Sequence, residues 1–124
     1  MIAADSSTLI AYIQDDKGAD VELLDANLMS GQIVISPIVL TELLSEPGLP
    51  MTHAKLIQNI PLLDFQDGFW LRVAQSRVTL IARGLRARLP DALIAQSSID
   101  HDVMLITRDA DFRHFAKYCG LKLA

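Results

Sequence analysis

The chain has 124 residues, of which 51% are hydrophobic and 21% are charged, and its formal net charge is −4. This length and composition predict one folded domain and exclude a disordered chain. No apolar run approaches the roughly 18 residues of a membrane span, and the N-terminal run is interrupted at Asp5, so we expect neither a span nor a secretory leader. The single cysteine, Cys119, excludes an internal disulfide and fits a cytoplasmic location.

Apolar residues in the first half of the chain alternate between short β-branched runs and helical spacing. Hydroxyl residues at 6–8 can cap a helix, Pro37 is favoured at a helix start, and Gly31 and the segment 46–50 are stop signals. In order, this half predicts a strand at 1–5, helices at about 6–13 and 19–30, a strand at 32–36, and helices at 37–44 and 52–59.

The second half continues the alternation. In order, it predicts a weaker strand at 60–65, an amphipathic helix at 67–83, a helix from Pro90 or Asp91 to His101, a strand at 103–107, a helix at 110–117 and a short strand at 119–123. Gly84 is the expected stop of the amphipathic helix. Strands that alternate with helices predict an α/β fold with a parallel sheet and helices on both faces.

Four acidic residues, Asp5, Glu42, Asp91 and Asp109, lie close behind short apolar runs. Asp5 and Asp109 fall at the expected ends of strands, and the other two fall on helices that can open toward the same sheet edge, where ligands bind in such folds. Carboxylates are rarely buried unless they are paired or bound to a cation. Gathered together, these four require a hard cation such as Mg²⁺ or Mn²⁺. Acidic metal sites of this kind serve phosphodiester hydrolysis.

Each carboxylate also has an ordinary structural explanation. Asp5 and Asp109 can cap helices, Asp91 suits a first helical turn, and Glu42 can be a solvated helix residue. However, capping does not require four acids at equivalent topological positions, and crowded like charges oppose folding when no cation is bound. Taken together, the four acids therefore favour a metal site.

Residues 68–90 contain five arginines and no acidic residue, so this stretch carries +5 and the rest of the chain −9. Clustered arginine favours contact with phosphate, although a run of charges is commonly just a solvated helix face. The candidates for contact with a nucleic-acid backbone are Arg72, Arg77, Arg83, Arg86 and Arg88.

Four local sequences together resemble the PIN-domain family, and in order and spacing they are most similar to the VapC-type toxins of bacterial toxin–antitoxin pairs. They are Asp5-Ser6-Ser7 after a strand, Thr41-Glu42-Leu43-Leu44, Pro90-Asp91-Ala92-Leu93-Ile94-Ala95, and Leu105-Ile106-Thr107-Arg108-Asp109-Ala110-Asp111-Phe112. The resemblance covers nearly the whole chain. It departs from the family pattern at 96–98, where many relatives carry a small residue and a threonine and this chain has Gln-Ser-Ser.

The resemblance implies one PIN-like domain over residues 1–124, built as a three-layer α/β/α sandwich around a central parallel sheet of four to five strands. It also implies a metal-dependent ribonuclease. The family's four acids map in order onto Asp5, Glu42, Asp91 and Asp109, and they would hold one or two Mg²⁺ or Mn²⁺ ions.

Three further residues match family positions near such a site. Ser7 and Thr107 match hydroxyl positions that can hydrogen-bond the carboxylates and orient them, and both also suit capping. Asp111 matches an additional acid near the site, and it equally suits a cap or an ion pair of the last helix.

The partners implied by the resemblance are an RNA substrate, a cognate antitoxin that inserts a peptide into the active groove, and a second copy of the chain in a homodimer. Two alternatives stay open. One is a catalytically silent binding module in which the acids form a structural metal site. The other is a nuclease that acts on DNA or on structured nucleic acid, because recognition of the RNA 2′-hydroxyl depends on geometry that the sequence does not give.

Overall fold

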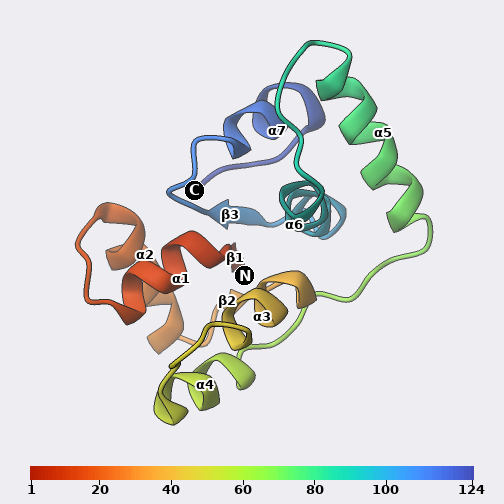
Figure 1. The fold of residues 1–124 in the computed structure, drawn as a ribbon. Helices are drawn as coiled ribbons and strands as arrows, with labels where there is room; N and C mark the ends of the chain where they lie inside the picture. The colour runs from red at the N-terminus through yellow and green to blue at the C-terminus, as the bar shows by residue number, and fades with distance from the viewer.

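The computed structural model describes residues 1–124, in which three strands are surrounded by seven helices (Figure 1). The elements in chain order are β1 (Ile2–Ala4), α1 (Ser6–Ile13), α2 (Ala19–Met29), β2 (Ile33–Val34), α3 (Pro37–Leu44), α4 (Met51–Gln58), α5 (Phe69–Ile81), α6 (Leu89–Asp100), β3 (Met104–Ile106) and α7 (Phe112–Cys119). The α/β class and the parallel sheet expected from the sequence are confirmed.

The strands pair in the order β2-β1-β3, and both pairings are parallel. Ile2 of β1 lies opposite Ile33 on one side and Met104 on the other. The chain therefore moves from β1 to one neighbour and later crosses to the opposite neighbour, which makes the carboxyl end of β1 a topological switch point. In open α/β sheets, ligands bind at this place.

The expected sheet of four to five strands is not confirmed, because the predicted edge strands are reduced to single bridges. Leu62 alone bridges Ile35, and Leu123 alone bridges Leu105. Pro61 has no N–H to donate, so the pairing is limited to two bonds: the Ile35 N–H donates to the Pro61 carbonyl at 3.0 Å, and the Leu63 N–H donates to the Ile35 carbonyl at 2.9 Å. Near the C-terminus, the predicted strand was placed too early, because Cys119 still belongs to α7.

The helix boundaries differ from the sequence-based ones at several points. The helix predicted at 67–83 begins only at Phe69, because Gly68 adopts a left-handed conformation with φ 80° before it. The helix predicted at 110–117 begins at Phe112. The hydroxyl residues 6–8 do not precede α1 as caps but form its first turn, and the residue that caps this helix is Asp5.

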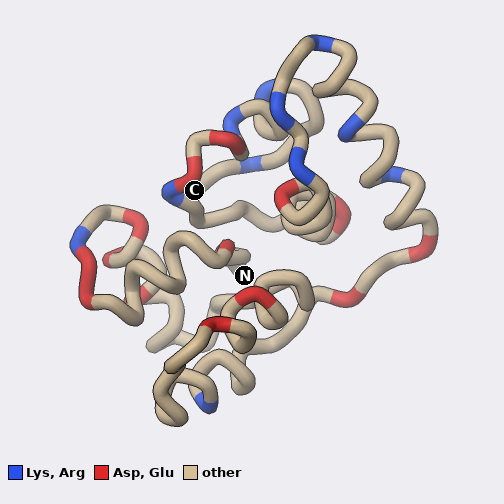
Figure 2. The backbone as a smooth tube through the Cα atoms, in the orientation of Figure 1, with Lys and Arg blue, Asp and Glu red and all other residues tan.

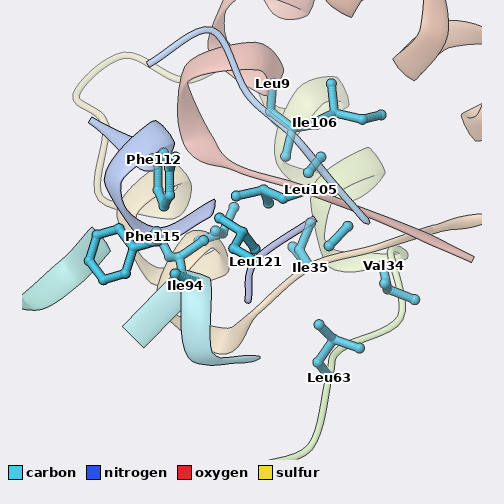
Figure 3. Close-up of a cluster of buried hydrophobic side chains, with 14 of the residues drawn as sticks. Leu9, Val34, Ile35, Leu63, Ile94, Leu105, Ile106, Phe112, Phe115 and Leu121 are labelled. Carbon is cyan, nitrogen blue, oxygen red and sulfur yellow. The ribbon is translucent and has the colours of Figure 1, made fainter. Parts of the chain in front are cut away.

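A cluster of buried apolar residues fills the space between the sheet and the helices, and Figure 3 shows part of it. Strand residues such as Val34, Leu105 and Ile106 are almost fully buried, as is typical of parallel strands covered on both faces. The helix α2 packs against β2 and β3, and α6 packs against β3. This packing fixes where the strand ends lie. None of the helices has the length and apolar character that crossing a membrane requires.

Candidate metal and nucleic-acid site

Asp5 lies directly after β1, at the switch point of the sheet, and it is only 3% exposed. Its carboxylate caps α1, because Oδ1 accepts a 3.2 Å hydrogen bond from the backbone N–H of Thr8. The capping role considered from the sequence is thus present. It leaves the second carboxylate oxygen, Oδ2, available for other partners.

Two hydroxyl groups hold the Asp5 carboxylate from the side. Thr107 Oγ1 donates a hydrogen bond of 2.6 Å to Oδ2, and Ser7 Oγ lies 2.8 Å from Oδ1 and 2.9 Å from Oδ2. The two hydroxyl oxygens are themselves 3.3 Å apart. Ser7 comes from the first turn of α1 and Thr107 directly follows β3, so the carboxylate is fixed by the ends of two adjacent strands.

Burial raises the pKa of Asp5, because a charged carboxylate loses its hydration there. Hydrogen bonds from Thr107, Ser7 and the Thr8 backbone act in the opposite direction, and the nearby charge of Asp109 adds to the increase. A cation bound beside Asp5 would favour the ionised form and remove this cost.

Asp91, Asp109 and Asp111 form an acidic cluster in which one carboxylate oxygen from each residue lies within 4.8 Å of the others. Asp91 is in the first turn of α6, and the other two are in the turn between β3 and α7. This turn is held by its own hydrogen bonds: the Asp109 N–H donates to Thr107 Oγ1 at 3.0 Å, and the Asp111 N–H donates to Asp109 Oδ1 at 2.9 Å.

The pKa of Asp91 is raised to about 6, with burial as the largest cause and the charge of Asp109 as the next. Asp111 and Glu42 raise it further, and Arg88 opposes the increase. Glu42 is therefore within electrostatic reach of the cluster, although it lies exposed on α3. Ser6 Oγ donates a 2.7 Å hydrogen bond to Glu42 Oε1 and so ties this carboxylate to the start of α1.

The donor set fits a hard divalent cation. It consists of carboxylate oxygens alone, with no histidine or cysteine among them, and such ligands suit Mg²⁺ and Mn²⁺. The raised pKa of Asp91 agrees with this, since burial and then the charge of Asp109 disfavour its ionised form, which a bound cation would favour.

The family model of the PIN domain matches residues 2–118. The chain belongs to the PIN domain family. A solved structure with a similar fold is the crystal structure of VapBC2 from Rickettsia felis bound to a DNA fragment from their promoter. Its match has a TM-score of 0.78 at 22% sequence identity and covers 100% of this chain and 98% of that chain. No curated protein matches the chain.

The five candidate arginines of the PIN domain occupy different environments. Arg72 makes a bidentate pair with Asp100, with bonds of 2.9 and 2.6 Å, and Arg77 donates to the Ala87 carbonyl at 2.9 Å. Both are thus engaged within the protein. The other three, Arg83, Arg86 and Arg88, are exposed in the segment between α5 and α6.

Two of the exposed arginines have partners of interest. Arg86 Nη1 lies 3.7 Å from Asp111 Oδ2 at the edge of the acidic cluster. Arg83 stacks over the Tyr118 ring, with its guanidinium carbon 4.6 Å from the ring centroid. Arg88 acts on the cluster through its charge, which lowers the pKa of Asp91.

Positive charge gathers on one part of the PIN domain. Figure 2 shows most Lys and Arg positions on α5, on α7 and in the segment between α5 and α6, while α1 to α4 are mostly neutral or acidic. Residues 69–124 contain nine of the eleven Lys and Arg residues. The acidic cluster lies beside this basic region, since Arg86 Nη1 is 3.7 Å from Asp111 Oδ2.

Sequence reasoning missed several residues that shape the site. Ser6, which the sequence suggested as a helix cap, donates a hydrogen bond to Glu42. Asp20 and Arg108 form a bidentate ion pair next to Thr107. Arg113 on α7 lines a cavity of about 240 Å³ together with Asp109. The only signal in the sequence was position, since Ser6 follows Asp5 directly and Arg108 stands between Thr107 and Asp109.

Proposed function

We propose that this PIN domain is a Mg²⁺- or Mn²⁺-dependent endoribonuclease of the VapC type, acting as the toxin of a toxin–antitoxin pair. The observation that carries the proposal is the arrangement of carboxylates at the switch point of the sheet. Buried Asp5 lies there at the end of β1, and the charge of Asp109, a member of the acidic cluster, acts on it. Burying and crowding carboxylates destabilises a fold unless a cation binds between them.

Asp5, Glu42, Asp91 and Asp109 would hold the metal, and Asp111 is a further ligand candidate because its oxygen lies within the same cluster. Bound there, one or two ions supply an activated water and stabilise charge on the scissile phosphate and the leaving oxygen. The protein's own contribution is to orient the ligands. Ser7 and Thr107 do this for Asp5 through hydrogen bonds to its carboxylate.

Binding of the substrate would use the exposed arginines near the cluster. Arg86 and Arg88 lie next to the acids, and Arg83 and Arg113 extend the basic surface over α7. Because these guanidinium groups can contact phosphates in a bidentate manner, they would position an RNA backbone across the carboxylates. Arg72 and Arg77 would have a structural role, because Arg72 is bonded to Asp100 and Arg77 to the Ala87 carbonyl.

A cognate antitoxin and a homodimer belong to the same proposal. The VapBC2 structure supports the antitoxin, and a half-buried acidic cluster is suited to an arginine or lysine from a partner peptide. The helix α5 supports a dimer, because it exposes Trp70, Leu71, Val78 and Ile81 along its surface. A location in the cytoplasm fits a ribonuclease of this type.

The deciding experiment is cleavage of a mixed RNA pool by the purified protein with Mg²⁺, with Mn²⁺ and with EDTA. We expect cutting with either metal, none with EDTA, and loss of cutting in Asp5→Ala. The matched control is Asp102→Asn, which changes an exposed aspartate at the opposite end of β3. Normal cutting by Asp5→Ala would overturn the assignment of the site, and equal cutting of single-stranded DNA would overturn the RNA specificity.

A further inference from the structure

An ion pair between Asp20 and Arg108 lies beside the proposed metal site. Arg108 Nε donates to Asp20 Oδ2 at 2.8 Å, and Arg108 Nη2 donates to Asp20 Oδ1 at 2.9 Å. Nη2 also donates to the carbonyl of Lys17 at 3.2 Å. Two parallel bonds and a third to the backbone fix the plane of the guanidinium, which a single-point contact would not do.

The chain leaves room for this pair at Gly18, the residue before α2. A Cβ atom at this position would lie 2.6 Å from Asp20 Oδ1 and 3.0 Å from Arg108 Nη2. Gly18 also has φ 152°, a conformation that other residues rarely adopt. A side chain at position 18 would therefore crowd the Asp20–Arg108 pair and strain the backbone before α2.

Both members of the pair connect to the residues that hold Asp5. The backbone N–H of Arg108 donates to Ser7 Oγ at 3.2 Å, and Asp20 Oδ2 accepts a 3.1 Å hydrogen bond from Thr8 Oγ1. Ser7 Oγ and the Thr8 N–H both bind the Asp5 carboxylate. Arg108 also stands between Thr107, which binds Asp5, and Asp109, which belongs to the acidic cluster.

We propose that Asp20 and Arg108 are positioning residues for the metal site. Their ion pair fastens the turn after β3 to the start of α2, and so keeps Thr107 and Asp109 in register with Asp5. This inference rests on the proposed function, because it concerns the geometry of the same carboxylates. It adds two residues that would touch neither the metal nor the RNA.

The pair stabilises the ionised form of Asp20, because the hydrogen bond from Arg108 is the largest cause that lowers the pKa of this carboxyl to about 2. Since Arg108 is about one third exposed, screening by solvent reduces what the pair contributes to the free energy of unfolding. The exposed Lys122–Asp102 pair shows the contrast, since its 2.6 Å contact connects to none of the residues that bind Asp5. A role in placing the turn explains why three hydrogen bonds and a glycine are assembled around one surface arginine.

The experiment measures Mn²⁺ affinity by isothermal titration calorimetry with no RNA present, on the wild type, Arg108→Gln, Asp20→Asn and the double variant. We expect each single change to weaken the affinity about 10- to 100-fold, the usual effect of losing a residue that orients a metal ligand. The double variant should be no weaker than the worse single variant, because both changes break one unit. Arg108→Lys should fall between Arg108→Gln and the wild type, since it retains the charge and loses the bidentate geometry.

Asp100→Asn is the matched control, because it breaks the other bidentate arginine–aspartate pair, that of Arg72. It should leave the Mn²⁺ affinity within about twofold of the wild type, and circular dichroism would verify that every variant is folded at the temperature used. In cleavage assays, Arg108→Gln should lose kcat at low Mn²⁺, keep its KM for RNA, and recover most of its rate in excess Mn²⁺.

Two results would overturn the inference while leaving the proposed function intact. One is a wild-type protein that binds Mn²⁺ and cuts RNA while Arg108→Gln has unchanged metal affinity. The other is a selective rise in the KM for RNA in Arg108→Gln, which would make Arg108 a substrate contact. A wild-type protein that neither binds Mn²⁺ nor cuts RNA would overturn the proposed function and the inference together.

Discussion

Thr107 Oγ1 donates a 2.6 Å hydrogen bond to Oδ2 of Asp5, although 102 positions separate the two residues. The bond joins the carboxyl ends of the adjacent strands β1 and β3. The same Thr107 oxygen accepts a 3.0 Å hydrogen bond from the backbone N–H of Asp109. One hydroxyl group thus connects the buried carboxylate directly to a member of the acidic cluster.

Replacing this hydroxyl by a methyl group should impair the metal site more than the fold. In Thr107→Val, Asp5 loses a donor that favours its ionised form, and the Asp109 N–H loses its acceptor. We expect Mn²⁺ affinity and cleavage to fall about 10- to 100-fold, and the free energy of unfolding to fall by about 1–2 kcal/mol. Titration calorimetry and urea unfolding measure the two effects.

Thr79→Val is the control for this change. Its hydroxyl bonds only the carbonyl one turn earlier in α5, so cleavage should stay at the wild-type rate. Equal losses of activity in Thr79→Val and Thr107→Val would show that the effect of Thr107 is not specific to the site.

The stability of the metal-free protein should rise when Asp91 loses its charge. The pKa of Asp91 is about 6 in the folded protein and 3.8 in the reference state, so the folded state binds the extra proton between these values. Stability therefore falls as the pH rises from about 4 to about 6, and the cost stays constant above that. With the partial exposure of Asp91 taken into account, the cost at pH 7 is about 1–2 kcal/mol.

Asp91→Asn should thus unfold at higher urea concentration than the wild type at pH 7 in EDTA, should lose this advantage below about pH 4, and should not cleave RNA. Thermal melts with added Mn²⁺ provide the complement. Metal at 100 times its Kd should stabilise the wild type by about 2.7 kcal/mol and stabilise Asp91→Asn much less. If Asp91→Asn is less stable than the wild type at pH 7 in EDTA, the ionised Asp91 does not destabilise the folded protein and the prediction is wrong.

The sequence predicts the strand ends well, and with them the location of Asp5 and Asp109, because a buried strand is recognisable as an apolar run. It predicts less about how side chains meet across long separations. The bond from Ser6 to Glu42 and the pair of Asp20 with Arg108 join α1 to α3 and α2 to the turn after β3. Such contacts depend on tertiary packing, which no local pattern encodes.

The edges of the sheet show the same limit. Pro61 and the glycine at position 120 interrupt pairing at segments whose composition looks strand-like, so two predicted strands became single bridges.

The run of arginines was visible in the sequence, yet its division into engaged and exposed side chains was not. Arg72 and Asp100 are 28 positions apart, and only their helices' packing brings them together.

This division predicts different effects for arginines from one cluster. Arg86→Gln and Arg88→Gln should each weaken RNA binding and reduce the slope of log Kd against log salt by about 1 or less, as expected for one lost phosphate contact. Arg72→Lys should lower the melting temperature, because it disrupts the bond pattern with Asp100, and should leave the salt slope unchanged. Fluorescence anisotropy with a labelled RNA, in EDTA to prevent cutting, measures the slopes. A reduced salt slope in Arg72→Lys, with unchanged slopes in Arg86→Gln and Arg88→Gln, would place the RNA over α5 and away from the acidic cluster.

The apolar surface of α5 should bury itself against a second copy of the chain. Trp70, Leu71, Val78 and Ile81 are each more than half exposed, a density of apolar side chains that a lone domain rarely presents on one helix. Size-exclusion chromatography with light scattering should give twice the chain mass of 13.7 kDa at micromolar concentration. Val78→Glu should give the monomer without loss of folding, since the side chain of residue 78 is 66% exposed. Gln58→Glu, which adds the same charge to the exposed surface of α4, should remain dimeric. A wild-type protein that elutes as a monomer at this concentration would exclude the dimer and leave the α5 surface for another partner.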